Sequence, residues 1–377
     1  MKLLATAADI GATISAIRLA EPLRALQQER PALALRLKSF HECLRSDLAW
    51  ADVLIVQRGN SRRAWRLVER MQRGGGRVVF EIDDLLTEVP ASLLHHRAAQ
   101  RGRPWLLRGL AAADRVSVST ERLGRALHPP PRAWSVVPNH GWAPSGGWPT
   151  APTQPSHPSG PLRPATLLLA SSDHVPVAAL AAGLQRLPPA RPWRLVAVGP
   201  VADDLERAGL RVERHPPRPR ADFLRWARSL PDVLAVIPVG ATPFDACKSA
   251  IKFFDYGLAG VPVVCADRPP YSDVVRDGRT GLLAADTPEG WAGALRRALE
   301  DRAATRSRAA AAEACVGRAH ALAQTVQSWA GLLDTLAPRA APAPPPAPLL
   351  DAMQAWALRL RRANRERLAR RASRGPV

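Results

Sequence analysis

The sequence predicts an α/β fold with two lobes, each a parallel sheet covered by helices on both faces, and a ligand cleft between them. Short continuous apolar runs alternate with helical patterns, which is typical of parallel strands buried on both sides. The alternation stops near residue 143 and restarts at residue 165. A chain of 377 residues is long enough for two separate cores.

The first lobe is expected to span residues 1–142. Strands are predicted over residues 1–6, 33–37, 53–57, 77–82, 115–119 and 135–137. A helix over residues 62–73 has apolar residues on one face and ends at three consecutive glycines, which favour a helix C-terminus. A further helical pattern covers residues 106–114.

Residues 143–164 are dense in Pro, Gly, Ser and Thr without periodicity, and they are expected to link the lobes. The second lobe is predicted over residues 165–336. Its expected strands are 165–170, 193–198, 210–214, 233–238 and 261–266, and its expected helices are 220–230, 249–259 and 288–302.

A different composition follows residue 336. Residues 337–348 are rich in proline and predict a stiff, extended spacer. Residues 349–377 predict a basic amphipathic helix, with Met353, Trp356 and several leucines among arginines. Such a helix suits an anionic membrane surface or a partner, but a solvated tail or a helix closing the fold fits the pattern equally well.

The net charge of +20 favours anionic partners such as nucleotide sugars or lipid headgroups. Nucleic acid is not an expected partner, because the chain shows no interleaved aromatics and no recognised nucleic-acid-binding module. The four cysteines are far apart, which favours a reduced, cytoplasmic setting. Neither a signal peptide nor an uncharged run of roughly 20 residues is evident, so we expect a protein that is cytoplasmic or peripheral on the inner membrane face.

Residues 243–281 carry the clearest chemical pattern. Lys248, Ser249, Lys252 and Asp255 are expected on one predicted helix that starts near Lys248 and follows a buried strand. Helix N-termini present free N–H groups to phosphate, so these residues predict a diphosphate site in which the carboxylate accepts from a ribose diol. The alternative is an ordinary solvated helix face with a Lys–Asp pair.

A second candidate lies in the first lobe, where Asp83 and Asp84 end a buried strand. Either carboxylate is placed to orient or deprotonate an acceptor hydroxyl, or to contact a donor sugar. Alternatively, Asp84 caps the helix that follows. Gly11 is a candidate for close approach of the first loop to a phosphate, although a lone glycine also serves in a simple turn. Nothing else in the sequence builds a metal site, so no metal and no cofactor are expected.

The stretch CKSAIKFFDYGLAGVPVVCADRPPYSDVVRDGRTGLL resembles the donor-binding segment of the retaining family-4, or group 1, glycosyltransferases. It is most similar to a bacterial branch with a Cys-Lys-Ser, Lys-Phe, acid-Tyr pattern. The resemblance extends to VVFEIDDLLTEVP, AADRVSVST and SVVPN in the first lobe and to SSDH in the second, and it covers most of residues 1–335. It implies the GT-B fold, in which two Rossmann-like lobes face each other across a cleft.

The resemblance also implies roles for single residues. The acid that holds the nucleotide ribose falls on Asp255, whereas a second motif acid is replaced by Cys247. Lys248 and Lys252 would take over contacts to the diphosphate or sugar. Arg18 would help to neutralise phosphate, since residues 171–174 replace a basic pair of the wider family, and Tyr256 would pack beneath the donor.

The function that this resemblance implies is metal-independent transfer of a sugar, of hexosyltransferase type, from a nucleotide diphosphate. The acceptor would be a glycan, a lipid-linked molecule or another hydroxyl compound, with retention at the anomeric carbon, in bacterial surface polysaccharide or glycoconjugate synthesis. The candidate catalytic residues are Asp83, Asp84 and Lys252. The missing acid at Cys247 keeps a second interpretation open, a catalytically silent scaffold that binds a nucleotide or a glycan.

Overall fold

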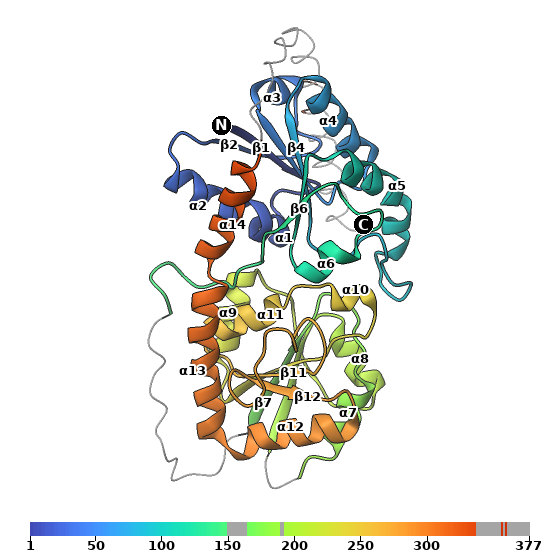
Figure 1. The fold of residues 1–377 in the computed structure, drawn as a ribbon. Helices are drawn as coiled ribbons and strands as arrows, with labels where there is room; N and C mark the ends of the chain where they lie inside the picture. Colours follow the sequence, from blue (N-terminus) through green and yellow to red (C-terminus); the bar gives the residue numbers. More distant parts are fainter. Residues whose placement is uncertain (149–163, 189–191, 337–355, 357–358, 360–377) are drawn as a thin grey trace, which may run out of the picture.

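The computed structural model consists of two lobes, each built on one six-stranded sheet (Figure 1). It describes residues 1–148, 164–188, 192–336, 356 and 359. The strand order is β2-β1-β3-β4-β5-β6 in the first sheet and β12-β11-β10-β7-β8-β9 in the second. Paired strands run parallel in both sheets, which confirms the predicted fold class.

The first lobe follows the predicted alternation closely. Its strands are β1 (Lys2–Ala7), β2 (Ala34–Ser39), β3 (Val53–Gln57), β4 (Arg77–Ile82), β5 (Arg115–Val118) and β6 (Trp134–Val136). Its helices are α1 (Thr13–Ser15), the π-helical η1 (Ala16–Ala20), α2 (Glu21–Glu29), α3 (Arg45–Trp50), α4 (Arg62–Arg73), α5 (His96–Ala112) and α6 (Glu121–Ala126).

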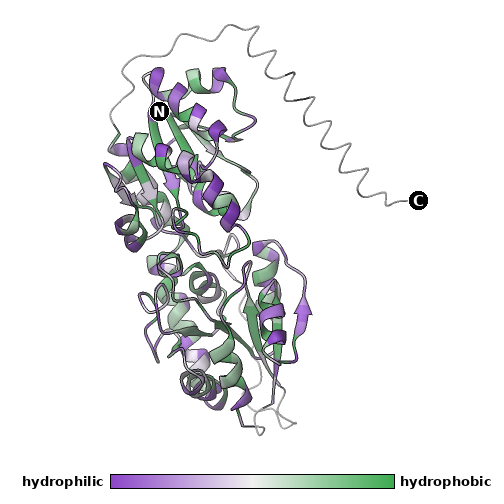
Figure 2. Cartoon of the chain, turned by 90° about the vertical axis from the view of Figure 1, so that its right-hand side faces the viewer, coloured by the Kyte–Doolittle hydropathy of each residue, from purple (hydrophilic) through white to green (hydrophobic). Residues whose placement is uncertain are grey.

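Apolar side chains alternate between the two faces of this first sheet. Leu3 and Ile55 belong to the cluster under α2, whereas Leu4 and Leu54 belong to the cluster under α4 and α5. This is the two-residue period of a strand applied to a continuous apolar run. Figure 2 shows the result, with apolar strands inside and hydrophilic residues on the outer helices.

The second lobe has the same layered plan. Its strands are β7 (Ala165–Ala170), β8 (Trp193–Val198), β9 (Glu213–His215), β10 (Val233–Ile237), β11 (Val263–Ala266) and β12 (Leu282–Ala284). Its helices are α7 (Ala178–Gln185), α8 (Val201–Arg207), α9 (Arg220–Ser229), α10 (Pro243–Ala246), α11 (Ile251–Leu258), α12 (Pro288–Glu300) and α13 (Arg302–Ala319). The strand expected at 210–214 begins later, because the backbone of Gly209 and Leu210 closes the end of α8.

The helix predicted over residues 249–259 is also different. The Thr242 side chain accepts from the Asp245 N–H and starts the separate short helix α10, with Pro243 at its first position. The chain then turns through residues 247–250 before α11 begins at Ile251. Lys248 therefore lies in the turn and not on the helix that carries Lys252, so the expected shared helical face was wrong.

The last helix described, α14 (Leu322–Asp334), crosses from the second lobe back to the first. It lies beside α2, and its Trp329 is buried in the same cluster as Leu19 and Leu23 (Figure 1). The indole Nε1 of Trp329 also donates to the Arg18 backbone carbonyl at 3.0 Å. The first lobe is thus completed by residues that the sequence placed in the second lobe.

The turn between α10 and α11 joins the lobes as well. Phe244 and Cys247 are buried in the apolar cluster of the first lobe, and the Thr120 hydroxyl donates to the Cys247 carbonyl at 3.0 Å. The predicted linker is described only in part, since 149–163 lie outside the described residues. The Pro-rich spacer and all of the basic tail except residues 356 and 359 lie outside them too. Among the described residues, no helix has the length and apolarity needed to cross a membrane.

Candidate active site

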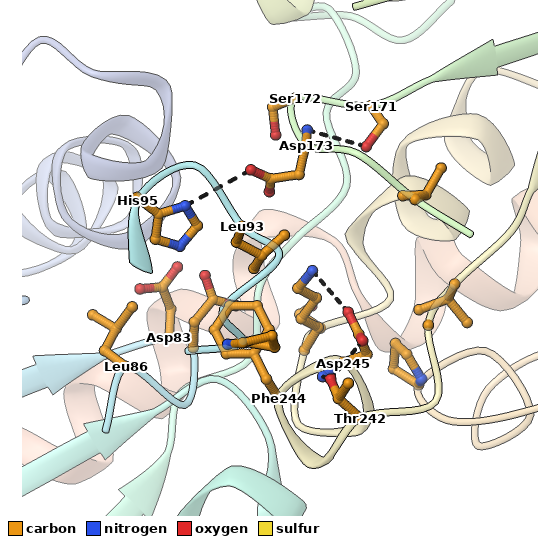
Figure 3. A pocket seen from close by; sticks show the side chains of 18 of the residues that line it. Asp83, Leu86, Leu93, His95, Ser171, Ser172, Asp173, Thr242, Phe244 and Asp245 are labelled. Atoms are coloured by element: carbon orange, nitrogen blue, oxygen red, sulfur yellow. Dashed lines mark hydrogen bonds and ion pairs between the residues drawn. The ribbon is translucent and has the colours of Figure 1, made fainter. Parts of the chain in front are cut away.

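A cavity of about 940 Å³ lies between the lobes. Its walls come from the loops that follow β1, β3 and β4 in the first lobe and β7 and β10 in the second. These loops leave the carboxyl ends of parallel strands, which is where open α/β sheets bind ligands. Figure 3 shows side chains from both lobes converging on the cavity, including Asp83, His95, Asp173 and Asp245.

The second lobe contributes the N-terminus of α11 to this cavity. Ser249, Ile251 and Lys252 all line it. The residue before the helix is Ala250, which has no side-chain oxygen to cap the first N–H groups. These N–H groups and the positive end of the helix dipole suit an anionic ligand.

Lys252 and Lys248 differ in their partners. The Lys248 ammonium lies 3.2 Å from the Asp245 carboxylate and 4.7 Å from the centre of the Phe244 ring. Within the described part of the chain, the Lys252 ammonium has no hydrogen-bond or ion-pair partner. Burial lowers the pKa of Lys252 to about 8, and the positive charge of Lys248 acts in the same direction. A bound phosphate would supply the missing counter-charge.

The first lobe contributes two aspartates that are held by one arginine. Arg58 Nε and Nη2 donate to the two carboxylate oxygens of Asp83, and Nη2 also donates to Asp84 Oδ2 at 2.7 Å. Arg58 has a φ of +47°, a left-handed conformation that is uncommon for a residue with a side chain. Strained backbone of this kind occurs most often at functional sites.

The two aspartates have different environments. Asp83 is only 4% exposed, and both its carboxylate oxygens accept from Arg58. Asp84 is 24% exposed and keeps Oδ1 without a hydrogen-bond partner among the described residues. Burial raises the pKa of Asp84 to about 6, an effect to which the Asp83 charge adds and which Arg58 and Lys248 oppose. Asp84 therefore has a carboxylate oxygen left for a ligand, whereas both carboxylate oxygens of Asp83 are occupied by Arg58.

The loop after β7 brings a further acid into the cavity. Asp173 Oδ1 lies 3.8 Å from His95 Nδ1 of the first lobe, so this contact spans the cavity (Figure 3). The Asp173 N–H donates to the Ser171 hydroxyl at 3.3 Å. Gly199 permits this arrangement, because its φ is +86° and a Cβ there would lie 2.1 Å from the Ser171 carbonyl oxygen.

Asp255, predicted to bind ribose, is not among the residues that line this cavity. Its carboxylate accepts from Arg220 Nε and Nη2 and from the Trp142 N–H at 2.9 Å. Arg220 Nη2 also donates to the His140 carbonyl at 2.7 Å. Asp255 thus ties α9 and α11 to the segment that connects the lobes. Tyr256, predicted to lie beneath the donor, is buried in the core of the second lobe against Phe223.

Arg18 and Gly11 also lie away from the cavity wall. Arg18 is fully buried and donates from Nε to Glu81 Oε1 at 2.7 Å and from Nη1 to Asn139 Oδ1 at 2.8 Å. Its charge is therefore matched inside the first lobe, and direct contact with phosphate is not available to it. Gly11 is exposed, and its N–H donates to Asp9 Oδ1 at 2.9 Å within a turn.

Several cavity residues escaped prediction from the sequence. Arg58 was missed because its partners are 25 and 26 residues away, directly after the next strand. Its position directly after a buried strand was the available signal. His95 and Asp173 become neighbours only when the lobes face each other, so no sequence spacing relates them. Among the described residues, no group of three or more His, Cys, Asp or Glu side chains is arranged to hold a metal ion.

Comparison with protein families gives one match. Residues 167–301 match the family model described as "Glycosyl transferases group 1". The matched stretch runs from β7 to the end of α12 and contains Lys248, Ser249 and Lys252. The predicted resemblance to group 1 glycosyltransferases is confirmed over this part of the second lobe, and the bacterial branch stays a prediction. No curated protein sequence matches the chain significantly.

Solved structures with the same architecture cover most of the chain. HepE from Anabaena in complex with UDP and glucose has a TM-score of 0.60 at 17% identity, covering 89% of this chain and all of that one. Sucrose-phosphate synthase from Thermosynechococcus elongatus has a TM-score of 0.64 at 14% identity, with 89% and 98% covered. The lipopolysaccharide outer core galactosyltransferase WaaB has a TM-score of 0.57 at 12% identity, with 89% and 100% covered. These similarities confirm the GT-B fold.

Proposed function

We propose that the protein is a glycosyltransferase that moves a sugar from a nucleotide-diphosphate donor to a hydroxyl acceptor. One observation carries the proposal: the Lys252 ammonium, without a partner among the described residues, lines the interlobe cavity together with the N-terminus of α11. The same segment belongs to the stretch that matches the group 1 glycosyltransferase model. HepE, which shares the fold, was solved with UDP and glucose, and we infer a similar donor class here.

In the proposed reaction, the bond between the anomeric carbon and the diphosphate breaks while the acceptor oxygen bonds to the same carbon. Lys252, Lys248 and the α11 N-terminus stabilise the charge that develops on the departing diphosphate. The anomeric carbon passes through an oxocarbenium-like state. Asp84 orients the acceptor hydroxyl and takes its proton. We propose retention at the anomeric carbon, which requires the acceptor oxygen to approach the face of the sugar that the diphosphate leaves, and no metal ion or cofactor.

The proposed donor sugar is a hexose, and the proposed acceptor is a glycan or a lipid-linked molecule in bacterial surface polysaccharide synthesis. The shared fold with WaaB, a lipopolysaccharide galactosyltransferase, supports this setting. A cytoplasmic enzyme held on the inner membrane face by the basic tail would meet such acceptors, and that proposal rests on the composition of residues 349–377.

A thermal-shift screen tests the proposed donor class. The panel is UDP-glucose, UDP-galactose, GDP-mannose, ADP-glucose and dTDP-rhamnose, each compared with its nucleoside diphosphate. A ligand that binds only the folded protein raises the melting temperature, by an amount that grows with its concentration. We expect at least one nucleotide sugar to do so, and no shift with any of them would contradict the proposed function.

Cys247 keeps the scaffold function as a second candidate. The motif acid is absent there, and the cysteine side chain is buried in the core of the first lobe. Donor turnover separates the two functions. A nucleotide that binds without sugar transfer or donor hydrolysis would favour a scaffold, whereas turnover would favour the enzyme.

A further inference from the structure

A buried ion pair lies behind the cavity in the first lobe. Arg18 and Glu81 are both fully buried, and one atom of each, Arg18 Nη2 and Glu81 Oε2, has no partner among the described residues. A protein is often as stable, or more stable, when apolar residues of similar volume replace a buried ion pair, because both charges of the pair lose hydration on burial. The pair therefore calls for a role other than stability. Arg18 Nη1 donates to the Val137 carbonyl and to one other side chain, that of Asn139.

Arg18 fixes the orientation of the Asn139 side chain. A guanidinium carries only hydrogen-bond donors, so the Asn139 atom 2.8 Å from Arg18 Nη1 must be the amide oxygen. The amide nitrogen Nδ2 then points away from Arg18. This nitrogen has no hydrogen-bond partner among the described residues, and it is not one of the fully enclosed polar atoms. Asn139 lines the cavity, so its N–H groups are open to the cavity.

We propose that Asn139 is a donor-binding residue whose amide N–H groups bind an oxygen of the nucleotide sugar. Arg18 is its positioning residue, and Glu81 holds Arg18. Asn139 shares the cavity with the phosphate-binding candidates Ser249 and Lys252. The inference rests on the proposed function, because it takes the ligand of the cavity to be a nucleotide sugar.

Asn139→Asp is a sharp test, because the two side chains have nearly the same shape. Aspartate still accepts from Arg18, so the first lobe should fold normally, but it has no N–H to offer the ligand. Binding is measured by calorimetry with the nucleotide sugar that gave the largest thermal shift and with its nucleoside diphosphate. We expect at least tenfold weaker binding, about 1.4 kcal/mol. Weakening of both ligands locates the contact at the diphosphate, and weakening of the nucleotide sugar alone locates it at the sugar.

Asn60→Asp is the control for added charge, because Asn60 lines the same cavity and the substitution adds the same charge. Binding by Asn139→Asp within twofold of wild type would overturn the inference, and so would an equal loss in Asn60→Asp, which would point to repulsion alone. Either result leaves the proposed function standing. Failure of the wild-type protein to bind any of the nucleotide sugars overturns both.

The positioning role of Arg18 has its own readout. In the double variant Arg18→Met/Glu81→Met, the amide of Asn139 is free to rotate, so Asn139→Ala should then weaken binding less than threefold. In the wild-type background the same substitution should weaken binding at least tenfold. Equal effects in the two backgrounds would show that Arg18 does not act through Asn139 and would overturn that part of the inference.

Discussion

Lys252 differs from the other lysine and arginine side chains that line the cavity, because it alone has no carboxylate partner among the described residues. Lys248 is paired with Asp245, and Arg58 is paired with Asp83 and Asp84. A cation in partly desolvated surroundings stays protonated less readily, which is why the pKa of Lys252 falls to about 8. An incoming diphosphate would restore the balance of charge at this ammonium.

The Asp84 carboxylate leads to a prediction about pH. Its pKa is raised to about 6, so the ionised base is lost as the pH falls through that value, and transfer should decline on the acid side. Arg58 opposes this rise, so Arg58→Gln should move the acid limb to higher pH. Asp84→Asn should reduce transfer at least a hundredfold. The measurement is the pH profile of transfer for each variant.

Arg30→Gln is the control for Arg58→Gln, because Arg30 forms an exposed pair with Asp334 on α14, outside the cavity residues. Its pH profile should match that of the wild-type protein. If Arg58→Gln also leaves the acid limb in place, or Asp84→Asn transfers sugar at the normal rate, Asp84 is not the base.

At the scale of elements, helix α11 carries residues with two different structural roles, one at the cavity and one at the connection between the lobes. Lys252 faces the cavity, whereas Asp255 faces α9 and the connecting segment. The Asp255 contacts join a network that reaches the first lobe, since Arg220 Nη2 donates to the His140 carbonyl and His140 Nε2 lies 2.8 Å from Glu21 Oε2. Asp255 therefore helps to fix how the lobes are connected.

Asp255→Ala should consequently destabilise the protein more than it weakens donor binding. Arg220 is 11% exposed and would lose the carboxylate that it contacts most closely, keeping only Glu21 at 3.9 Å. Loss of one partner of a buried ion pair costs about 3 kcal/mol. Asp334→Ala, which breaks the exposed pair with Arg30, should cost less than about 1 kcal/mol. Melting temperatures and donor affinities of the two variants provide the comparison. A normal melting temperature with lost donor binding in Asp255→Ala would restore the ribose role that the family resemblance implies.

These elements also show what the sequence could predict. The strands β3 and β4 were predicted at their observed bounds, because a continuous apolar run with turn residues on both sides permits little else. The break between α10 and α11 was not predicted, because it depends on the Thr242 cap. The orientation of the Asp255 side chain depends on its ion pair with Arg220, which lies 35 residues earlier on another helix. No local sequence pattern predicts such a contact.

At the scale of the whole molecule, segments that follow the second sheet in the chain, or belong to the second lobe, pack into the core of the first lobe. Helix α14 completes the core of the first lobe, and α10 with the turn after it places Phe244 and Cys247 in another part of that core. The cavity between the lobes brings Asp84 of one lobe and Lys252 of the other to the same space. The two-lobed fold was predictable from the alternation of strands and helices, whereas the cross-lobe packing was not.

The basic tail gives a prediction at this scale. Removal of residues 338–377 should leave donor turnover in solution unchanged, because the removed residues follow the last described helix, α14. The truncated protein should be recovered less with vesicles that contain anionic phosphatidylglycerol, because Lys and Arg side chains near such a surface each contribute about 1 kcal/mol. Co-sedimentation with these vesicles measures the effect, and vesicles of neutral lipid are the control. Equal recovery of both proteins would rule out a membrane role for the tail.

The central claim is that Lys252 and the N-terminus of α11 hold the diphosphate of a nucleotide sugar. The most direct measurement is the rate of nucleoside diphosphate release from the five nucleotide sugars by wild-type protein, Lys252→Met and Lys252→Arg. We expect wild-type turnover of at least one donor, with a decline above pH 8 that Lys252→Arg lacks, and at least a tenfold lower rate for Lys252→Met. Turnover by Lys252→Met at the wild-type rate would contradict the claim.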